Sequence, residues 1–157
     1  MIHLSNEADT INVGKKIAQL ASPGDIFILT GDLGAGKTTF SKGFAEGLGI
    51  SQMIKSPTYT LIKEYDTATI PLYHMDVYRL GEGASDLGLD EYLDGDGVCL
   101  IEWGQYIKED IDWPFIELTF DKTTDDTRIL SITHSQAPVL HKQIQQTLHD
   151  NKGEKNE

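Results

Sequence analysis

Cysteine, long apolar runs and positive charge are all scarce in this sequence of 157 residues. Its single cysteine, Cys99, lies in an apolar run and cannot form an internal disulfide, which suits a reducing cytoplasm. No apolar run has the length of a transmembrane helix, and no charged and then apolar segment opens the chain as a signal peptide would. We therefore expect one cytoplasmic domain with no membrane partner.

The scarcity of positive charge bears on nucleic acids. The chain has 13 Lys and Arg residues against 25 Asp and Glu residues, for a formal net charge of −12. Proteins that hold nucleic acid by its phosphates need clustered Lys and Arg side chains. We expect no DNA partner, and contact with RNA only through another subunit. An acidic surface is suited to docking on a basic patch of a protein partner.

What the sequence does contain is a phosphate-binding loop. Residues 31–38, Gly-Asp-Leu-Gly-Ala-Gly-Lys-Thr, match the pattern G-x-x-x-x-G-K-[ST]. A short apolar segment of strand type, 24–30, precedes them, and Phe40, Phe44 and Leu48 then recur at every fourth residue, as on one face of a helix. This context predicts a nucleoside triphosphate site; the alternative is a glycine-rich turn that binds nothing.

Each residue type in the loop has a chemical reason. The glycines let the backbone curl so that successive amide hydrogens point at phosphate oxygens, and the start of the helix adds its positive dipole end. Lys37 would reach the β- and γ-phosphates, and the Thr38 hydroxyl would ligate magnesium. The nucleotide-binding positions expected here are Gly31, Asp32, Leu33, Gly34, Ala35, Gly36, Lys37, Thr38 and Thr39.

Hydrolysis needs an acid near the magnesium and a group that orients the attacking water. Glu102 ends a buried apolar run, 98–101, as such an acid does beside a P-loop strand. Asp76 lies on a more polar strand and is the second candidate. One of them would touch magnesium and the other would shape the water and threonine network; the alternative for each is a surface acid at a strand end.

Other residues near these positions have a functional and a structural interpretation. Thr58 could swing to the γ-phosphate as switch loops do, or be a turn residue. Trp103 could stack on a base, contact a partner or pack in the core. Arg79 could be an internal arginine finger or form a salt bridge. For His74, strand packing or a hydrogen bond to Asp76 is favoured over a metal site.

Several signatures of other nucleotide-binding proteins are missing. The nearest match to the guanine-specifying Asn-Lys-x-Asp is Asn-Lys-Gly-Glu at 151–154, which ends in the wrong acid, so we expect ATP or ADP. There is no arginine-rich lid of the small-molecule kinases, and no Leu-Ser-Gly-Gly-Gln of the transporter ATPases.

The periodicity of apolar residues predicts alternating helices and strands. A helix over 5–21 can be capped by Ser5 or Asn6, and 98–104 has the apolar character of a central parallel strand. Strands 113–121 and 127–133 would be the arms of a hairpin. Further strands are expected over 24–30, 58–65 and 70–80, and helices after Lys37, around 84–92 and over the apolar repeat at 137–148. We expect a single domain, 1–150, and a disordered polar tail, 151–157.

Four blocks in this order resemble the TsaE (YjeE) family, the bacterial ATPases required for threonylcarbamoyladenosine modification of tRNA. They are Gly-Asp-Leu-Gly-Ala-Gly-Lys-Thr-Thr at 31–39, Ser-Pro-Thr-Tyr-Thr at 56–60, His-Met-Asp-Val-Tyr-Arg-Leu at 74–80, and Glu-Trp at 102–103. The resemblance runs from about Thr10 to the second hairpin arm. It implies a P-loop NTPase-like α/β fold: a three-layer sandwich with a mostly parallel central sheet and a C-terminal antiparallel hairpin.

The resemblance also implies partners and residue roles. Family members work with TsaD, which joins threonylcarbamoyl to adenosine, and with TsaB; ATP hydrolysis resets that assembly, and tRNA is met only through it. Glu102 would belong at the magnesium with Thr38, and Asp76 would be the acid needed for hydrolysis. Thr58 would lie in a switch-like loop, and Thr10 and Arg128 near the nucleotide base.

Two other functions compete with an accessory ATPase. A stand-alone kinase for a small metabolite or nucleoside would use the same P-loop, but it needs a closed acceptor pocket for which the chain has little room. A nucleotide-binding switch without turnover would not need both Asp76 and Glu102. The sequence does not rank these two acids.

Overall fold

The computed structural model describes residues 2–31, 36–50, 62–65, 70–76, 90–102, 109, 111–123 and 127–154, with the backbone alone at 76, 90 and 150–154. No helix in these ranges is both long and apolar enough to cross a membrane. The elements along the chain are β1 (Ile2–Leu4), α1 (Glu7–Leu20), β2 (Ile26–Gly31), α2 (Lys37–Gly47), β3 (Ile62–Tyr65), β4 (Leu72–Asp76), α3 (Asp90–Leu93), β5 (Val98–Glu102), β6 (Phe115–Lys122), β7 (Arg128–Ser135) and α4 (Pro138–Glu154).

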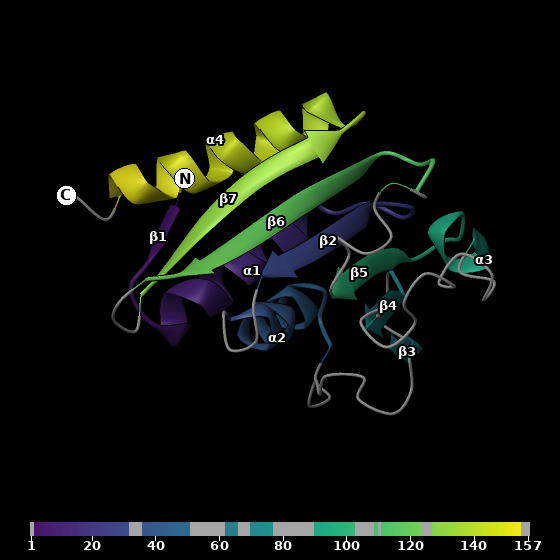
Figure 1. Ribbon diagram of the computed structural model, residues 1–157, viewed down its shortest axis with the longest axis horizontal. Helices are drawn as coiled ribbons and strands as arrows, with labels where there is room; N and C mark the ends of the chain where they lie inside the picture. The colour runs from purple at the N-terminus through teal and green to yellow at the C-terminus, as the bar shows by residue number, and fades with distance from the viewer. Residues whose placement is uncertain are drawn as a thin grey trace.

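The strands form one seven-stranded sheet in the order β1-β7-β6-β2-β5-β4-β3 (Figure 1). Strand β2 is parallel to both of its neighbours, β5 and β6, and β4 is parallel to β5. The pairs β6–β7, β1–β7 and β3–β4 are antiparallel. The predicted P-loop NTPase-like α/β fold, with a parallel centre and a C-terminal hairpin, is confirmed. Strand β1 was not predicted, because three residues are too few to show an alternating pattern.

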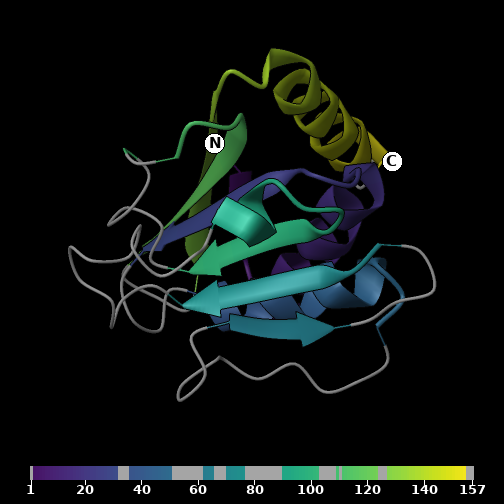
Figure 2. The ribbon, with the colours of Figure 1, turned by 90° about the vertical axis from the view of Figure 1, so that its right-hand side faces the viewer.

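Parallel pairing brings the carboxyl ends of β2, β4 and β5 to the same edge of the sheet. Figure 2 shows the arrowheads of β4 and β5 at this edge, with β3 running the other way. Ligands of open α/β sheets bind outside the carboxyl ends of the parallel strands. The last residues of these three strands are Gly31, Asp76 and Glu102, all of which were predicted as site residues. They therefore lie at the edge of the sheet where ligands of this fold class bind.

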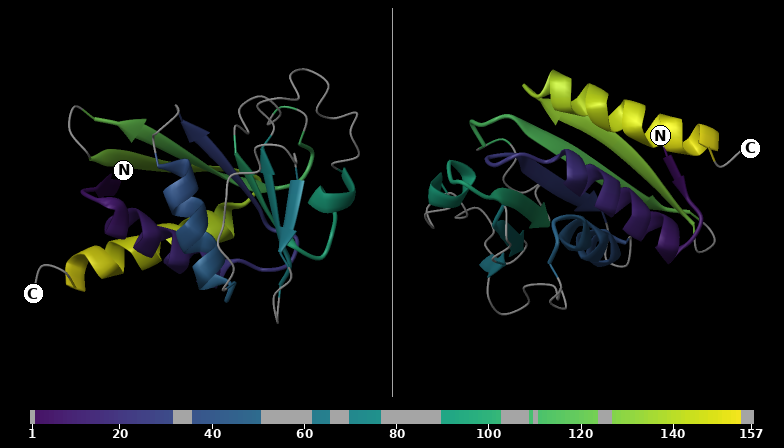
Figure 3. Two further views of the ribbon diagram at one scale, coloured as in Figure 1. Left: turned by 90° about the horizontal axis from the view of Figure 1, so that it is seen from below. Right: turned by 180° about the vertical axis from the view of Figure 1, so that it is seen from behind.

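The two faces of the sheet are covered unequally. Helices α1, α2 and α4 lie on the same face (Figure 3), where Phe40, Phe44 and Ile144 belong to one large core cluster with residues of β2, β5, β6 and β7. On the other face a smaller cluster joins Leu93 of α3 and Ile111 to β2, β4 and β5. Because both faces are covered at β5, all five of its residues are buried, as the apolar run predicts.

Cys99 illustrates the second face. Its side chain is buried in the smaller cluster, and Sγ donates to the backbone oxygen of Tyr92, 3.2 Å away. Burial raises the pKa of the Cys99 thiol to about 12, so the group stays protonated at neutral pH. The predicted buried strand position of the single cysteine is confirmed.

Helices α1 and α2 are in backbone contact because three glycines lie between them. A Cβ atom on Gly43 would lie 2.2 Å from the backbone oxygen of Ile11, and one on Gly14 would lie 2.6 Å from that of Phe40. A Cβ atom on Gly47 would come equally close to the backbone oxygen of Lys15. No side chain can be accommodated at such distances without separating the helices. This contact fixes the position of α2 relative to α1, and with it the position of Lys37, the first residue of α2.

The ends of α1 and α4 differ from prediction in detail. Asn6 is the N-cap of α1: its side chain accepts a hydrogen bond from the Asp9 amide at 2.9 Å, so the helix begins at Glu7. Helix α4 continues to Glu154, past the residue at which the polar tail was expected to begin. Extending an existing helix costs far less than nucleating one, and the glycine at 153 costs only about 1 kcal/mol relative to alanine.

Candidate functional site

The predicted strand–loop–helix context of the phosphate-binding loop is present. Strand β2 ends at Gly31, where φ is 149°, and α2 begins directly after Gly36, which has φ 106° and is the N-cap of the helix. These positive φ values favour glycine at both ends of the loop. The loop residues between them, Asp32, Leu33, Gly34 and Ala35, lie outside the described residues.

Lys37 opens α2 and is almost completely buried, with 5% of its surface exposed. Its Nζ donates to the backbone oxygen of Gly31, so the side chain folds back across the two ends of the loop. A cation at a helix N-terminus faces the positive end of the helix dipole, and the first turn of α2 contains no acidic residue. A buried ammonium group in this setting gives the site the electrostatics of an anion-binding site.

Thr38 and Thr39 follow Lys37 in the first turn of α2 and are half-buried. One turn later Ser41 is fully buried, and its Oγ donates to the backbone oxygen of Lys37 at 2.9 Å. This hydrogen bond joins two residues of α2, so Ser41 stabilises the first turn of the helix. The two threonine hydroxyls are therefore held at the start of α2, next to Lys37.

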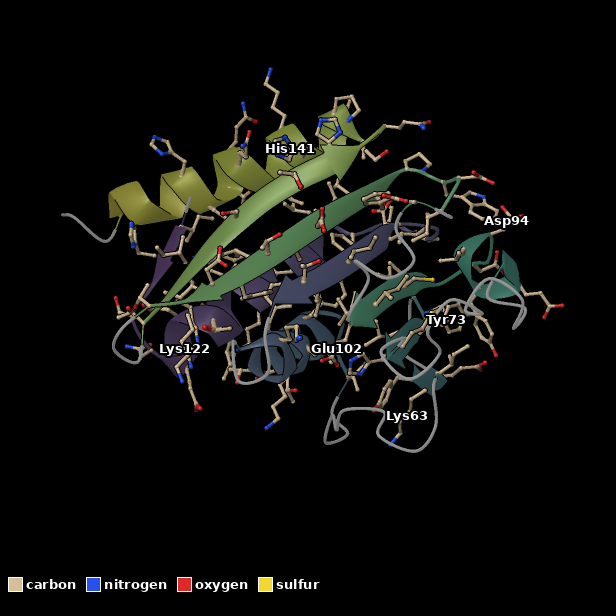
Figure 4. All side chains as sticks on the ribbon, in the orientation of Figure 1. Lys63, Tyr73, Asp94, Glu102, Lys122 and His141 are labelled. Carbon is tan, nitrogen blue, oxygen red and sulfur yellow. The ribbon has the colours of Figure 1, made fainter. Side chains whose placement is uncertain are left out.

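Glu102, labelled in Figure 4, is the last residue of β5. Its side chain is buried, with 3% of the residue surface exposed. It is paired with Leu29 of β2 and with Asp76 of β4 in the parallel registers. Residues alternate between faces along a strand, and Leu100 and Val98 belong to the core cluster that contains α2 residues. Glu102 therefore lies on the face of the sheet that α2 covers. Its partner in β2, Leu29, comes two residues before Gly31, where the loop begins. Asp76 is brought beside it by the backbone; its side chain lies outside the described residues.

His74 and Glu102 form a buried pair that was not predicted. The His74 Nε2 atom lies 2.5 Å from Oε2 of Glu102, and the imidazole is fully buried. The acid that the structure places against His74 is Glu102. The predicted alternative of a bond to Asp76 involves a side chain outside the described residues. The strand register explains the partner, because His74 pairs with Leu100 and thus shares a face with Glu102 across β4 and β5. Parallel pairing of these two strands was the missing information.

The two residues expected near the base come from opposite ends of the chain. Thr10 is a buried residue of α1, and its hydroxyl lies 3.4 Å from the Asn6 backbone oxygen. Arg128 opens β7, and its Cγ lies 4.0 Å from the place a Cβ on Gly36 would take. Its Nη1 also donates to the Thr127 backbone oxygen at 3.1 Å. The fold thus brings Arg128 to the end of the loop; Thr58, Arg79 and Trp103 lie outside the described residues.

The donor set fits magnesium better than a softer metal. Magnesium prefers oxygen ligands and is held in nucleotide sites by one or two protein groups together with phosphates and water. Thr38 and Glu102 offer a hydroxyl and a carboxylate, and within the described ranges there is no group of three His, Cys, Asp or Glu that could hold a metal ion by itself. The arrangement can hold a phosphate chain on Lys37 and helix α2, and it places the acid Glu102 at the end of the strand next to β2.

Comparison with known proteins identifies close relatives. Residues 4–130 match the family model described as threonylcarbamoyl adenosine biosynthesis protein TsaE. The tRNA threonylcarbamoyladenosine biosynthesis protein TsaE of Bacillus subtilis is 51% identical over 128 residues, covering 82% of this chain and 81% of the relative. The protein of the same name from Treponema pallidum is 40% identical over 126 residues, covering 79% of this chain and 93% of the relative. The crystal structure of Bacillus subtilis YdiB superposes with a TM-score of 0.80 at 41% identity, covering 95% of this chain and 94% of that one.

Proposed function

We propose a function from the premise that this chain belongs to the TsaE family, which takes part in the biosynthesis of threonylcarbamoyladenosine in tRNA. The proposed function of the chain is that of a magnesium-dependent ATPase. It hydrolyses ATP to ADP and phosphate, slowly when alone, and thereby resets the assembly that makes the modification. The observation that carries this proposal is the buried Lys37, which lies at the start of α2 and bridges the two ends of the glycine loop.

The phosphate chain would lie across the start of α2. Lys37 would exchange its bond to the Gly31 backbone for the β- and γ-phosphate oxygens, and the amides of residues 34–39 would hold the same phosphates. A bound phosphate chain would supply the negative charge that both the Lys37 ammonium and the N-terminus of α2 favour.

Magnesium, when bound with ATP, would neutralise charge on the β- and γ-phosphates. Thr38 and Glu102 would hold it, since one is at the first turn of α2 and the other at the carboxyl end of β5. Asp76, paired with Glu102 in the sheet, would orient the attacking water. These assignments give the two acids different tasks on adjacent strands.

The nucleoside would extend toward Thr10 and Arg128. Arg128 lies against Gly36 at the end of the loop, and Thr10 belongs to the helix that packs on α2. Thr58 and Trp103 are further candidates for contacts with the nucleotide, from the family resemblance. We propose adenine because the Asn-Lys-x-Asp signature for guanine is missing from the sequence.

The proposed partners are TsaD and TsaB, in the cytoplasm, with tRNA reached only through them. The net charge of −12 supports docking on a protein rather than on RNA. The test is steady-state ATP hydrolysis with magnesium, by the purified chain alone and then with the TsaB–TsaD pair. We expect low phosphate release that rises with the pair. Brisk release that ignores the pair would contradict the accessory role, and phosphate transfer to a small acceptor would identify a kinase instead.

A further inference from the structure

His74 and Glu102 form a contact in which both side chains are buried. The geometry assigns the ring hydrogen to Nε2, which then donates to the carboxylate oxygen Oε2 across 2.5 Å. A hydrogen bond to a charged group is stronger than a neutral one, and this pair is shielded from water on both sides. One of the two carboxylate oxygens of Glu102 is thereby fixed in place.

The imidazole directs its hydrogen bonding at this one acid. Nδ1 of His74 is buried and has no hydrogen-bond partner among the described residues, which leaves Glu102 as the group that the ring contacts there. Burying a polar ring costs free energy that an apolar side chain in the same place would not cost. Strand packing alone therefore does not account for a histidine in the middle of β4.

A glutamate needs such support if it is to hold magnesium. Its side chain has three rotatable bonds, and a free carboxylate at a strand end would sample many positions. Magnesium demands near-ideal octahedral geometry, so a ligand oxygen must be held closely in place. With Oε2 bound to His74, the plane of the carboxylate is set and Oε1 is the oxygen left for the ion.

We propose that His74 is the positioning residue for Glu102: through its Nε2–H it holds the carboxylate in the orientation that binds magnesium in the nucleotide complex. This inference rests on the proposed ATPase function. Hydrogen-bond partners that orient a metal ligand typically contribute about 10–100-fold to metal affinity or activity. His74 itself touches neither the ion nor the phosphates.

The test compares two substitutions of similar size. His74→Met fills the space without a donor, whereas His74→Gln places an amide N–H near the position of Nε2. For each purified variant, hydrolysis of ATP is measured against magnesium concentration, and binding of a fluorescent ATP analogue is measured in EDTA. Thermal unfolding is the control for folding.

We expect His74→Met to raise the magnesium concentration at half-maximal hydrolysis by about 10–100-fold, with unchanged binding of the analogue in EDTA. His74→Gln should recover most of that loss. In a Glu102→Gln background, His74→Met should change the magnesium dependence no further. An unshifted magnesium midpoint in folded His74→Met would overturn the positioning role, while a wild-type protein that binds no nucleotide would instead overturn the proposed function.

A measurement on the unaltered chain covers the case in which His74→Met does not fold. The Nε2–H of a buried histidine exchanges slowly with water and can be followed by NMR. Adding magnesium to the protein loaded with a non-hydrolysable ATP analogue should shift the His74 Nε2–H resonance, because its acceptor gains a cation. The same addition to Glu102→Gln should leave the resonance in place. A resonance that ignores magnesium in the wild type would contradict the inference.

Discussion

The parallel half of the sheet, with β2, β4 and β5, and the antiparallel half, with β6, β7 and β1, bury different kinds of residue. Every residue of β5 is buried, whereas β6 and β7 each combine buried, half-buried and exposed positions. Within the described ranges, the buried polar residues all belong to β4, β5, α1 or α2. They are Thr10, Lys37, Ser41, His74 and Glu102.

This difference sets the half of the sheet that contributes buried polar strand residues apart from the half that does not. An antiparallel sheet can leave one face in water, so the polar residues of β6 and β7 have low cost where they are. Polar groups inside the parallel half cost free energy on burial unless they are paired. Three of them, Lys37, His74 and Glu102, lie at the carboxyl ends of the parallel strands or contact a residue there, where binding of a phosphate chain and a metal would offset the cost of their burial.

The largest expected effect comes from Lys37→Ala. Removing the ammonium takes away the buried cation at the start of α2, so binding of ATP with magnesium should be lost and hydrolysis abolished. Calorimetric titration with ATP and a phosphate-release assay measure the two effects. Lys15→Ala is the matched control, because Lys15 is a partly exposed lysine of α1 that pairs with Glu46 at 3.3 Å. Unchanged affinity and turnover in Lys37→Ala would refute the site.

The next largest effect is expected when a carboxylate in the parallel half of the sheet, Glu102, is compared with one on β6, Glu117. Glu102→Gln should keep the fold and lower hydrolysis on the order of a hundredfold or more, because it removes charge beside the reacting phosphates. Glu117→Gln changes a carboxylate on β6 that accepts a hydrogen bond from the Thr30 hydroxyl at 2.9 Å, and the amide oxygen of Gln can still accept it. Hydrolysis by Glu117→Gln should match the wild type. Equal losses in both variants would remove the distinction between the halves.

Much of the fold follows from local sequence patterns. The loop motif, the four-residue spacing of Phe40 and Phe44, and the apolar run that ends at Glu102 predicted α2, β2 and β5 correctly. The hairpin of β6 and β7 was predicted for the same reason, since each arm has strand composition over eight residues. Strand β3 lies within the strand predicted over 58–65. Strand β1 was missed because it depends on pairing with the distant β7, which a local pattern does not contain.

The site was predictable where a motif fixes it and not where strands meet. Lys37 follows from the loop pattern alone. The bond between His74 and Glu102 joins residues 28 positions apart and depends on the register of β4 against β5. The approach of Arg128 to Gly36 likewise depends on the position of β7 in the sheet. The sequence places these side chains on strands, but the order and alignment of the strands decide which of them touch.

A core substitution in α4, which packs on β7 of the antiparallel half, should lower stability without lowering the rate of hydrolysis. Ile144 of α4 is fully buried in the large core cluster, far along the chain from the loop. Ile144→Ala should lower the free energy of unfolding by about 2–5 kcal/mol, through lost burial and the cavity it leaves. Urea unfolding gives this value. Hydrolysis per folded molecule, measured well below the unfolding transition, should remain at the wild-type level; a loss comparable to that of Glu102→Gln would mean that α4 belongs to the site.

The smallest expected effect tests how firmly α2 is held. Gly43→Ala puts a methyl group 2.2 Å from the Ile11 backbone oxygen, so α2 must move away from α1. Overpacking of this kind costs about 1–3 kcal/mol, and displacing α2 should also lower hydrolysis because Lys37 moves with it. The control is Gly49→Ala, where the new Cβ would meet no atom within 4 Å but the φ of +85° is unfavourable. That variant should lose about 1–2 kcal/mol of stability from the backbone alone and keep its turnover. If both variants lose stability and neither loses turnover, the α1–α2 contact stabilises the fold without positioning Lys37.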